Sequence, residues 1–331
     1  MIFATTRQQQ RGVALITALL IAALVTVAAV AMASRQQLDM RRTGNMLEAD
    51  QAYMYVLAAE SWTIQILRQD QQTNQIDTLD EDWAMKIPPL PVEGGMVSGS
   101  IEDLQGRFNL NNLIDASPGN NQGRPDMDQN RILQRILAQV SLTQKDVQFS
   151  PFVANRITDW IDPDANALAD GAEDLTYLSI EQTPYRAANR LMASPSELAA
   201  VAGLSLTDVA ALKPFVATLP RPATATAGTP VNVNTALPMV LMSLHQDITP
   251  QIADDLIAYR TATPFEQATD FVDKLLADHH ITLAPSLVSV SSDYFLITSD
   301  AAIGRTTLRM YSLLERTNSG INVLRRGIGS Y

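Results

Sequence analysis

The chain has 331 residues, no cysteine and a formal net charge of −11, from 24 Lys and Arg against 35 Asp and Glu. This length is sufficient for two or more domains. The acidic balance argues against nucleic acid as a partner, because phosphate binding needs clustered Lys and Arg. The lack of cysteine excludes disulfides, thiolate metal sites and a cysteine nucleophile. No phosphate-binding, nucleophile-elbow or zinc-protease motif is present, so we do not expect an enzyme.

An uncharged apolar run without Pro or Gly extends from Val13 to Ala33. At ~1.5 Å rise per residue, its roughly 21 residues span the ~30 Å hydrocarbon core of a bilayer, whereas a secretory signal has an apolar core of only ~7–15 residues. We therefore expect a membrane-spanning helix over 13–33. The run ends in Ala31-Met32-Ala33, a pattern of signal-peptidase sites, so cleavage before Ser34 is an alternative.

The helical pattern continues beyond the apolar run, which predicts one N-terminal helix over 13–70. Apolar residues recur at three- and four-residue spacing, with charged and amide residues between them, at Leu38, Met46, Leu47, Ala52, Tyr53, Val56, Leu57, Ile64 and Leu67. A helix that is apolar in its first part and amphipathic in its second suits a subunit that waits in a membrane and later packs against neighbouring helices.

The start of this helix, Arg11-Gly12-Val13-Ala14-Leu15-Ile16-Thr17, resembles the prepilin-peptidase site of type IV pilins and type II secretion pseudopilins. The resemblance implies that residues 1–12 are a leader, that the bond between Gly12 and Val13 is cut, and that Val13 is N-methylated. Most members carry Glu as the fifth mature residue, where it neutralises the terminal amine of a neighbouring subunit, because an unpaired charge within the membrane is costly. Thr17 stands there instead, which is typical of the K subunits, the minor pseudopilins at the filament tip.

The remaining pattern predicts a small sheet that a helical segment interrupts. Pro88-Pro89-Leu90-Pro91 indicates a turn region, and a strand is expected near Met96–Leu104. β-rich segments return from Leu287 to the end of the chain. We therefore expect an α+β fold with a discontinuous antiparallel sheet domain over 71–110 and 286–331. A large all-α insertion is expected over 111–285, with helical hairpins at 194–216 and 231–278.

An acidic stretch from Asp162 to Asp174 carries the strongest chemical signal. Asp162, Asp164 and Asn166 match the first, third and fifth positions of a calcium-binding loop, Asp170 matches the ninth, and Glu173 the bidentate twelfth. Carboxylate oxygens at alternate residues of a tight loop can converge on one hard cation. Ala167 replaces the glycine of the sixth position, so the stretch is not a true EF-hand. A solvated acidic loop that binds nothing is the alternative.

The same stretch resembles the K subunits, whose inserted helical domain holds calcium here. The likeness rests on Asp159-Trp160-Ile161-Asp162, on Gly171-Ala172-Glu173-Asp174 and on Pro184–Asn189. It implies Asp162, Asp164, Asp170, Glu173 and Asp174 as calcium ligands, with Asn166 and Asp159 as further candidates. The segment from Val231 to Phe265 is similar to DNA-binding helix-hairpin-helix modules but lacks their Gly-rich hairpin, so we expect it to serve in packing or in docking a partner.

Together these patterns resemble the K minor pseudopilin of the type II secretion system over nearly the whole chain. The resemblance implies a single-pass protein of the bacterial inner membrane with a cytoplasmic N-terminus and a periplasmic bulk. Its expected partners are the I- and J-type minor pseudopilins, the prepilin peptidase, the inner-membrane secretion platform and, through 13–33, the lipid bilayer. Capping of the pseudopilus tip and support for protein export are the implied functions. A calcium-dependent periplasmic binding or adaptor module, secreted or membrane-anchored, is the alternative.

Overall fold

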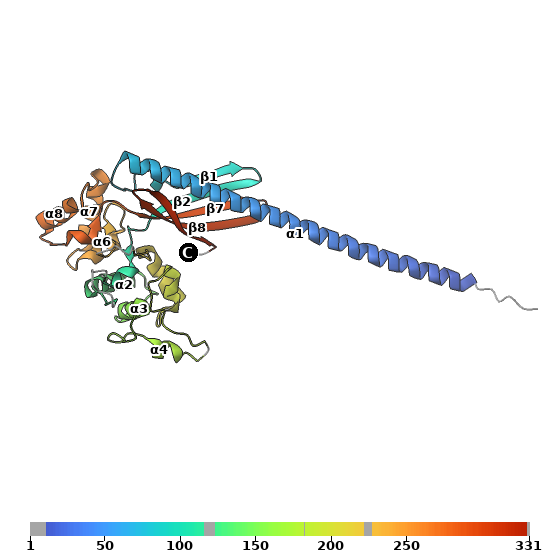
Figure 1. The fold of residues 1–331 in the computed structure, drawn as a ribbon, viewed down its shortest axis with the longest axis horizontal. Coiled ribbons are helices and arrows are strands. Elements are labelled where there is room, and N and C mark those ends of the chain that lie inside the picture. Colours follow the sequence, from blue (N-terminus) through green and yellow to red (C-terminus); the bar gives the residue numbers. More distant parts are fainter. Residues whose placement is uncertain (1–10, 116–122, 182, 222–226, 330–331) are drawn as a thin grey trace, which may run out of the picture.

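The computed structural model describes residues 11–115, 123–181, 183–221 and 227–329. Its longest element is α1 (Arg11–Thr73), whose N-terminal half projects far beyond the rest of the molecule (Figure 1). Every residue from Val13 to Thr43 is exposed. Later in the helix, the buried residues follow a spacing of three and four and are Ala52, Val56, Glu60, Thr63 and Leu67. The second half of α1 therefore packs one face against the protein body, and the first half contacts none of it.

A five-stranded antiparallel sheet lies under the second half of α1. Its strands, in spatial order, are β1 (Ile87–Val92), β2 (Gly95–Asp103), β7 (Tyr294–Ile303), β8 (Thr306–Thr317) and β9 (Gly320–Ile328). β2 and β7 are neighbours, with Asp103 opposite Phe295. The chain therefore leaves the sheet after Asp103 and returns at Tyr294 on the adjacent strand, which fixes both ends of the insertion close together. The sequence had placed these boundaries at 110 and 286.

The turn predicted for the Pro-rich run was wrong, because Pro88-Pro89-Leu90-Pro91 lies within β1. Proline has no N–H to donate to a strand ladder, so it is tolerated in an edge strand and excluded from central ones. β1 is such an edge, and its register with β2 shifts between Ile87 and Leu90.

The two faces of the sheet pack against different parts of the protein. On one face, Leu67 of α1 packs with Ile101, Phe295 and Leu314, and the ring of Trp83 meets that of Phe295 edge-on at 5.3 Å. On the other face, a smaller cluster joins the sheet to the insertion and comprises Leu104, Ala217, Leu219, Tyr294, Leu296 and Leu313. The sheet is thus held between α1 and the insertion (Figure 1).

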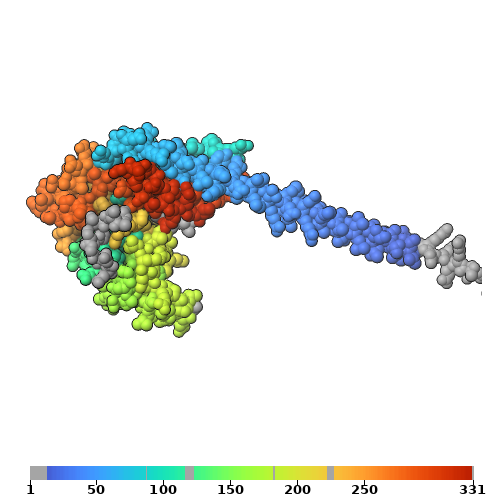
Figure 2. Space-filling view, in the orientation of Figure 1, coloured from blue at the N-terminus to red at the C-terminus, as the bar shows by residue number. Residues whose placement is uncertain are grey.

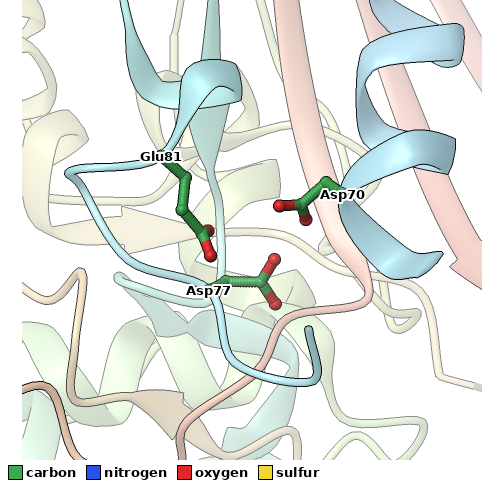
Figure 3. A group of neighbouring side chains, drawn as sticks. All are labelled: Asp70, Asp77 and Glu81. Carbon is green, nitrogen blue, oxygen red and sulfur yellow. The ribbon is translucent and has the colours of Figure 1, made fainter. Parts of the chain in front are cut away.

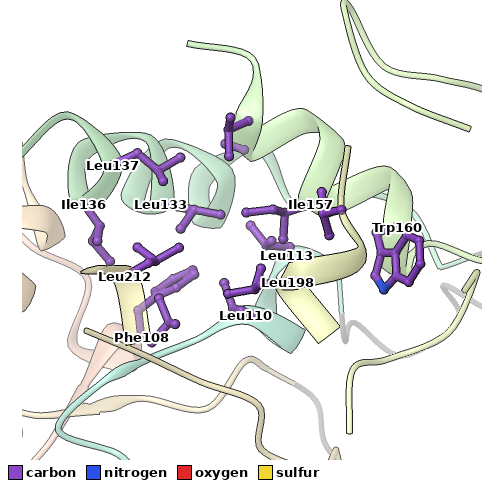
Figure 4. Packing of buried hydrophobic residues seen from close by; sticks show 14 of the residues in the cluster. Phe108, Leu110, Leu113, Leu133, Ile136, Leu137, Ile157, Trp160, Leu198 and Leu212 are labelled. Atoms are coloured by element: carbon purple, nitrogen blue, oxygen red, sulfur yellow. The ribbon is translucent and has the colours of Figure 1, made fainter. Parts of the chain in front are cut away.

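The first unit of the insertion has its own apolar core. Its helices are α2 (Met127–Thr143), α3 (Val153–Ile161), α4 (Asp174–Leu178) and α5 (Leu206–Leu212). Leu133 and Ile136 of α2 face Phe108 across this core (Figure 4). The apolar residues of α2 and α3 that line this core are buried, whereas Phe152, just before α3, is 39% exposed. The predicted hairpin over 194–216 begins with a capping box at Ser194, but Pro195–Ala200 forms a 3-10 helix rather than an α-helix.

The second unit contains α6 (Pro238–Leu244), α7 (Pro250–Ala262) and α8 (Ala268–His279). The expectation that Val231–Ala236 begins a helix was wrong. Val231–Asn232 forms β5, which pairs in parallel with β6 (Val288–Ser289), and β3 (Phe108–Asn109) pairs likewise with β4 (Val216–Ala217). The insertion is therefore predominantly helical rather than all-α. The predicted α+β class, with a long N-terminal helix, an antiparallel sheet and an inserted helical domain, is confirmed.

Asp103 joins the sheet to the insertion at the point where the chain crosses between them. Its buried carboxylate accepts hydrogen bonds from Gln105 N at 2.7 Å and, farther along the chain, from Asn232 Nδ2 at 3.0 Å. Thr235 Oγ1 and Ser292 Oγ donate to it at 2.5 and 2.7 Å. Burial raises the pKa of this carboxyl, and the hydrogen bonds from Thr235, Ser292 and Gln105 act against the rise. One side chain therefore connects the departing strand, the second unit and the returning segment.

Candidate functional site

Three acidic side chains from the predicted loop converge beside the end of α3. Asp159 lies in the last turn of that helix, Asp162 follows it directly, and Glu173 precedes α4. One oxygen from each carboxylate lies within 4.8 Å of the others, and the residues are 0%, 1% and 7% exposed. Hard divalent cations such as Ca²⁺ take oxygen ligands at 2.3–2.6 Å, so this separation suits one shared ion.

The backbone of the loop wraps around Asp159. Leu168 N donates to Asp159 Oδ1 at 3.1 Å, and Ala172 N donates to Oδ2 at 2.8 Å. A Cβ at Gly171 would stand 1.8 Å from Asp159 Oδ2, so only glycine permits this approach. Burial raises the pKa of Asp159, and the two backbone donors oppose that rise. Asp159 therefore shapes the loop as well as contributing charge.

The carboxylates of Asp162 and Glu173 are buried without enough hydrogen-bond donors. Within the described residues, Asp162 Oδ1 and both side-chain oxygens of Glu173 have no hydrogen-bond partner. Burial raises the pKa of Asp162 to about 7, with further contributions from the charges of Asp164, Glu173 and Asp159. Burial likewise raises the pKa of Glu173 to about 7, followed by the charges of Asp159 and Asp164. A divalent cation would satisfy these oxygens and remove the repulsion, so the donor set fits calcium.

The structure does not bring the other predicted ligands into this group. The Asp164 side chain is exposed and accepts from Asn166 N at 2.7 Å and from Asn166 Nδ2 at 3.0 Å. Asp170 is exposed in the left-handed region, with φ 53°. Asp174 instead pairs with Arg186 at 3.1 Å and accepts from Ala187 N. In the described structure Asp164, Asn166, Asp170 and Asp174 therefore lie outside the converging group, and the backbone of the loop donates to Asp159 instead.

Sequence reasoning missed one residue beside the site. Asn189 has φ 45°, its backbone N donates to Trp160 O at 3.0 Å, and its Nδ2 donates to Asp164 O at 3.0 Å. These bonds hold it against the chain on either side of Asp162, and its buried Oδ1 has no partner among the described residues. An amide oxygen is a suitable calcium ligand. The likeness of Pro184–Asn189 to the K subunits was the signal that could have pointed to it.

An aromatic cluster is formed by residues that neighbour the site in the chain, Trp160 between Asp159 and Asp162 and Tyr177 in α4. The ring of Trp160 meets that of Tyr177 edge-on at 5.1 Å and that of Tyr185 at 6.2 Å. Trp160 also borders the core of the first unit (Figure 4).

The N-terminal half of α1 is the second candidate functional element. Within the described residues it is the one helix long and apolar enough to cross a membrane, with a mean hydropathy of 2.8 in its most apolar window and none of that window buried. Gly12 and Val13 lie in its first turn, and residues 1–10 of the expected leader lie outside the described residues. Thr17 Oγ1 hydrogen-bonds to Val13 O at 3.1 Å and Ala14 O at 3.0 Å, so it is satisfied within the helix.

Comparison with known proteins decides the family. The family described as type II secretion system (T2SS), protein K matches residues 106–221 and 231–291. A protein of that name from Pseudomonas aeruginosa is 35% identical over 98% of this chain and 94% of its own length. The chain belongs to the type II secretion system protein K family. Another protein K, from Aeromonas hydrophila, is 30% identical over 93% of this chain and 94% of its own length. These relatives bear the name of a secretion-system component rather than of an enzyme.

A solved structure shares the architecture of this chain. It comes from the crystal structure of the GspK-GspI-GspJ complex of the enterotoxigenic Escherichia coli type 2 secretion system. The similarity has a TM-score of 0.71 at 26% identity and covers 88% of this chain and all of the other. The long helix, sheet and insertion therefore form a known arrangement of this family.

Proposed function

We propose that this protein is a minor pseudopilin that caps the tip of the periplasmic pseudopilus, supports its assembly and so assists the export of folded proteins. The observation that carries the proposal is the unburied apolar half of α1, which needs a bilayer or neighbouring helices to cover it. The insertion forms a bulky mass beside the sheet (Figure 2). Such a mass would obstruct helical stacking of further subunits and so favours a terminal position.

The same helix supports a single-pass topology in the bacterial inner membrane. In this proposal the prepilin peptidase cuts between Gly12 and Val13 on the cytoplasmic side, and Val13 is then methylated. The bulk of the chain lies in the periplasm and is assembled on the inner-membrane secretion platform. Thr17 is uncharged and cannot neutralise the terminal amine of another subunit, and its hydroxyl is hydrogen-bonded within its own helix. A subunit at the tip has no need of that pairing.

We also propose that the insertion holds calcium through Asp159, Asp162 and Glu173, with Asn189 as a further ligand. The support is the convergence of three carboxylates together with four buried oxygens that lack donors in the described structure. The ion would connect the end of α3 to the residues before α4, and so close the loop between them. Calcium would serve to stabilise this part of the fold, because a ligand that binds only the folded state lowers its free energy.

The proposed partners are the I- and J-type pseudopilins, an assignment supported by the complex in which the solved relative was determined. We expect the full-length chain, co-expressed with both and extracted in detergent, to purify with them in equal amounts. The major pseudopilin, co-expressed in place of the I- and J-type pseudopilins, serves as the matched control and should co-purify poorly with this chain.

The position in the filament can be tested by labelling. In filaments from overproduced major pseudopilin, antibody to this chain should label one end. Labelling along the whole filament, or purification without either partner, would contradict a tip subunit and favour a membrane-anchored adaptor.

A further inference from the structure

A second group of carboxylates lies at the opposite end of the sheet domain from the membrane helix, outside the proposed calcium site. Asp70 is in the last turn of α1, Asp77 is in the loop that follows, and Glu81 directly precedes a 3-10 helix at Asp82–Ala84. One oxygen from each lies within 4.8 Å of the others. Figure 3 shows the three side chains directed toward one space between the helix end and the loop.

Arg316 balances only part of this negative charge. Its guanidinium pairs with Asp70 Oδ2 at 3.0 Å and with Asp77 Oδ2, and lies 4.8 Å from the centre of the Phe295 ring. Glu81 accepts from Asn74 Nδ2 and from Thr78 N and Trp83 Nε1. These donors are neutral, so three carboxylates face one guanidinium. Burial raises the pKa of Asp70 to about 7, with further contributions from the charges of Glu81 and Asp77, in spite of Arg316.

Asp77 supplies the observation that points to a ligand. It is 1% exposed, and its Oδ2 accepts from Arg316 and from Ser292 N at 2.7 Å. Its Oδ1 is buried and has no hydrogen-bond partner in the described part of the chain. The Asp77 carboxylate is directed toward Asp70 (Figure 3). Leaving a buried carboxylate oxygen unpaired is costly, and a cation shared with Asp70 and Glu81 would satisfy it.

A cavity lies beside two of the three carboxylates, Asp70 and Glu81, and Asp77 is buried behind them. The cavity has a volume of about 680 Å³, and Asp70, Glu81, Trp62 and Trp83 are among its lining residues. Met85, which is 59% exposed, also lines it, so the cavity is open to water. Water molecules could therefore complete the coordination of an ion that receives three oxygens from the protein.

We propose that Asp70, Asp77 and Glu81 form a second site for a hard divalent cation of the calcium type. The ion lies on the Asp77 Oδ1 side, while Arg316 keeps the Oδ2 atoms of both aspartates. It joins the end of α1 to the loop that leads into the sheet, and through Asp77 to Ser292 at the return from the insertion. Three protein ligands beside a guanidinium give a weak site, with a Kd of about 0.1–1 mM.

Terbium luminescence tests the second site directly, because Trp83 Nε1 donates to Glu81 Oε2 at 2.6 Å and its indole can sensitise an ion bound there. The full-length chain in detergent carries Asp162→Asn and Glu173→Gln, which silence the first site. We expect saturable terbium emission that excess calcium displaces. Adding Asp70→Asn and Glu81→Gln should lower the affinity about tenfold or more, since affinity follows the number of charged ligands.

Asp82→Asn is the matched control, because Asp82 lines the same cavity but is not one of the three converging carboxylates. When Asp82→Asn is added to the protein that carries Asp162→Asn and Glu173→Gln, the affinity for terbium and calcium should not change. Single Asp70→Asn, which keeps an oxygen for Arg316, serves if the double substitution fails to fold. Absence of emission once the first site is silenced would overturn the second site. Emission unchanged by loss of the Asp70 carboxylate would overturn it equally.

Discussion

We expect calcium at about a hundredfold excess over its Kd to raise the melting temperature of the wild-type protein by about 5–10 °C, and Asp162→Asn to remove that increase. The physical reason is that Asp162 Oδ1 and the Glu173 oxygens are buried without donors in the described structure and gain a partner when the ion binds. Differential scanning calorimetry of the full-length chain in detergent, with calcium and with chelator, measures the effect.

The pKa values of the site predict how the folding stability and its increase by calcium change with pH. The folded-state pKa values of Asp162 and Glu173 are raised to about 7 from 3.8 and 4.5, first by burial and then by neighbouring carboxylates. Without calcium, their contribution to folding stability is therefore largest below about pH 4 and is lost as the pH rises to about 7. Calcium binds the charged forms, so its effect on the melting temperature should be larger at pH 8 than at pH 5.5. In chelator at pH 8, Asp162→Asn should be at least as stable as wild type.

Asp170→Asn is the matched control, since Asp170 fits the calcium-loop pattern but is exposed and outside the converging group. Asparagine also tolerates its positive φ of 53°. We expect the calcium effect to persist in this variant. If Asp170→Asn removed the effect and Asp162→Asn did not, the ion would be held by a loop arranged as the sequence pattern predicts, and the converging site would be wrong.

Asp103→Ala should destabilise the protein by about 3–5 kcal/mol, which is at the upper end for a single substitution. The substitution leaves Gln105 N, Asn232 Nδ2, Thr235 Oγ1 and Ser292 Oγ without their common acceptor. Chemical denaturation of the full-length chain measures the loss. Amide hydrogen exchange should increase at 232–236 and 290–293, because these segments lose their attachment to β2.

Asp300→Ala provides the comparison for Asp103. Asp300 also lies in the sheet and carries a bidentate pair with Arg309, at 2.6 and 3.0 Å, but this pair lies at the surface. Exposed ion pairs contribute about 0.2–1 kcal/mol, so its loss should have a small effect. Equal losses from both substitutions would show that Asp103 does not connect the insertion to the sheet.

Local patterns in the sequence predicted much of the fold. The apolar run and the three- and four-residue spacing located α1, because such periodicity reports which side of a helix is buried. β1 and β5 were missed for a different reason. Pro88 and Pro89 are compatible with a strand only at a sheet edge, and Val231 pairs with Val288 far along the chain. The local sequence shows neither the edge position of β1 nor the distant pairing partner of β5.

The candidate sites also depend on contacts that the local sequence pattern does not reveal. The acidic stretch located Asp162 and Glu173, but a spacing template assumes that the loop curves around an ion. It could not show that Leu168 N and Ala172 N would bind Asp159. Asn189 and the Asp70, Asp77 and Glu81 group depend on contacts between separate elements. Sequence spacing carries no direct information on such contacts, so the structure was needed to find them.

The intact mass and N-terminal residue of the protein from its native membrane test the central claim most directly. The proposed function predicts a chain that starts at Val13 with one additional methyl group on its amine. A chain that starts at Ser34 would be a secreted protein cut by signal peptidase, and an uncut chain that starts at Met1 would be a plain membrane anchor. Either result would contradict the assignment as a processed pseudopilin.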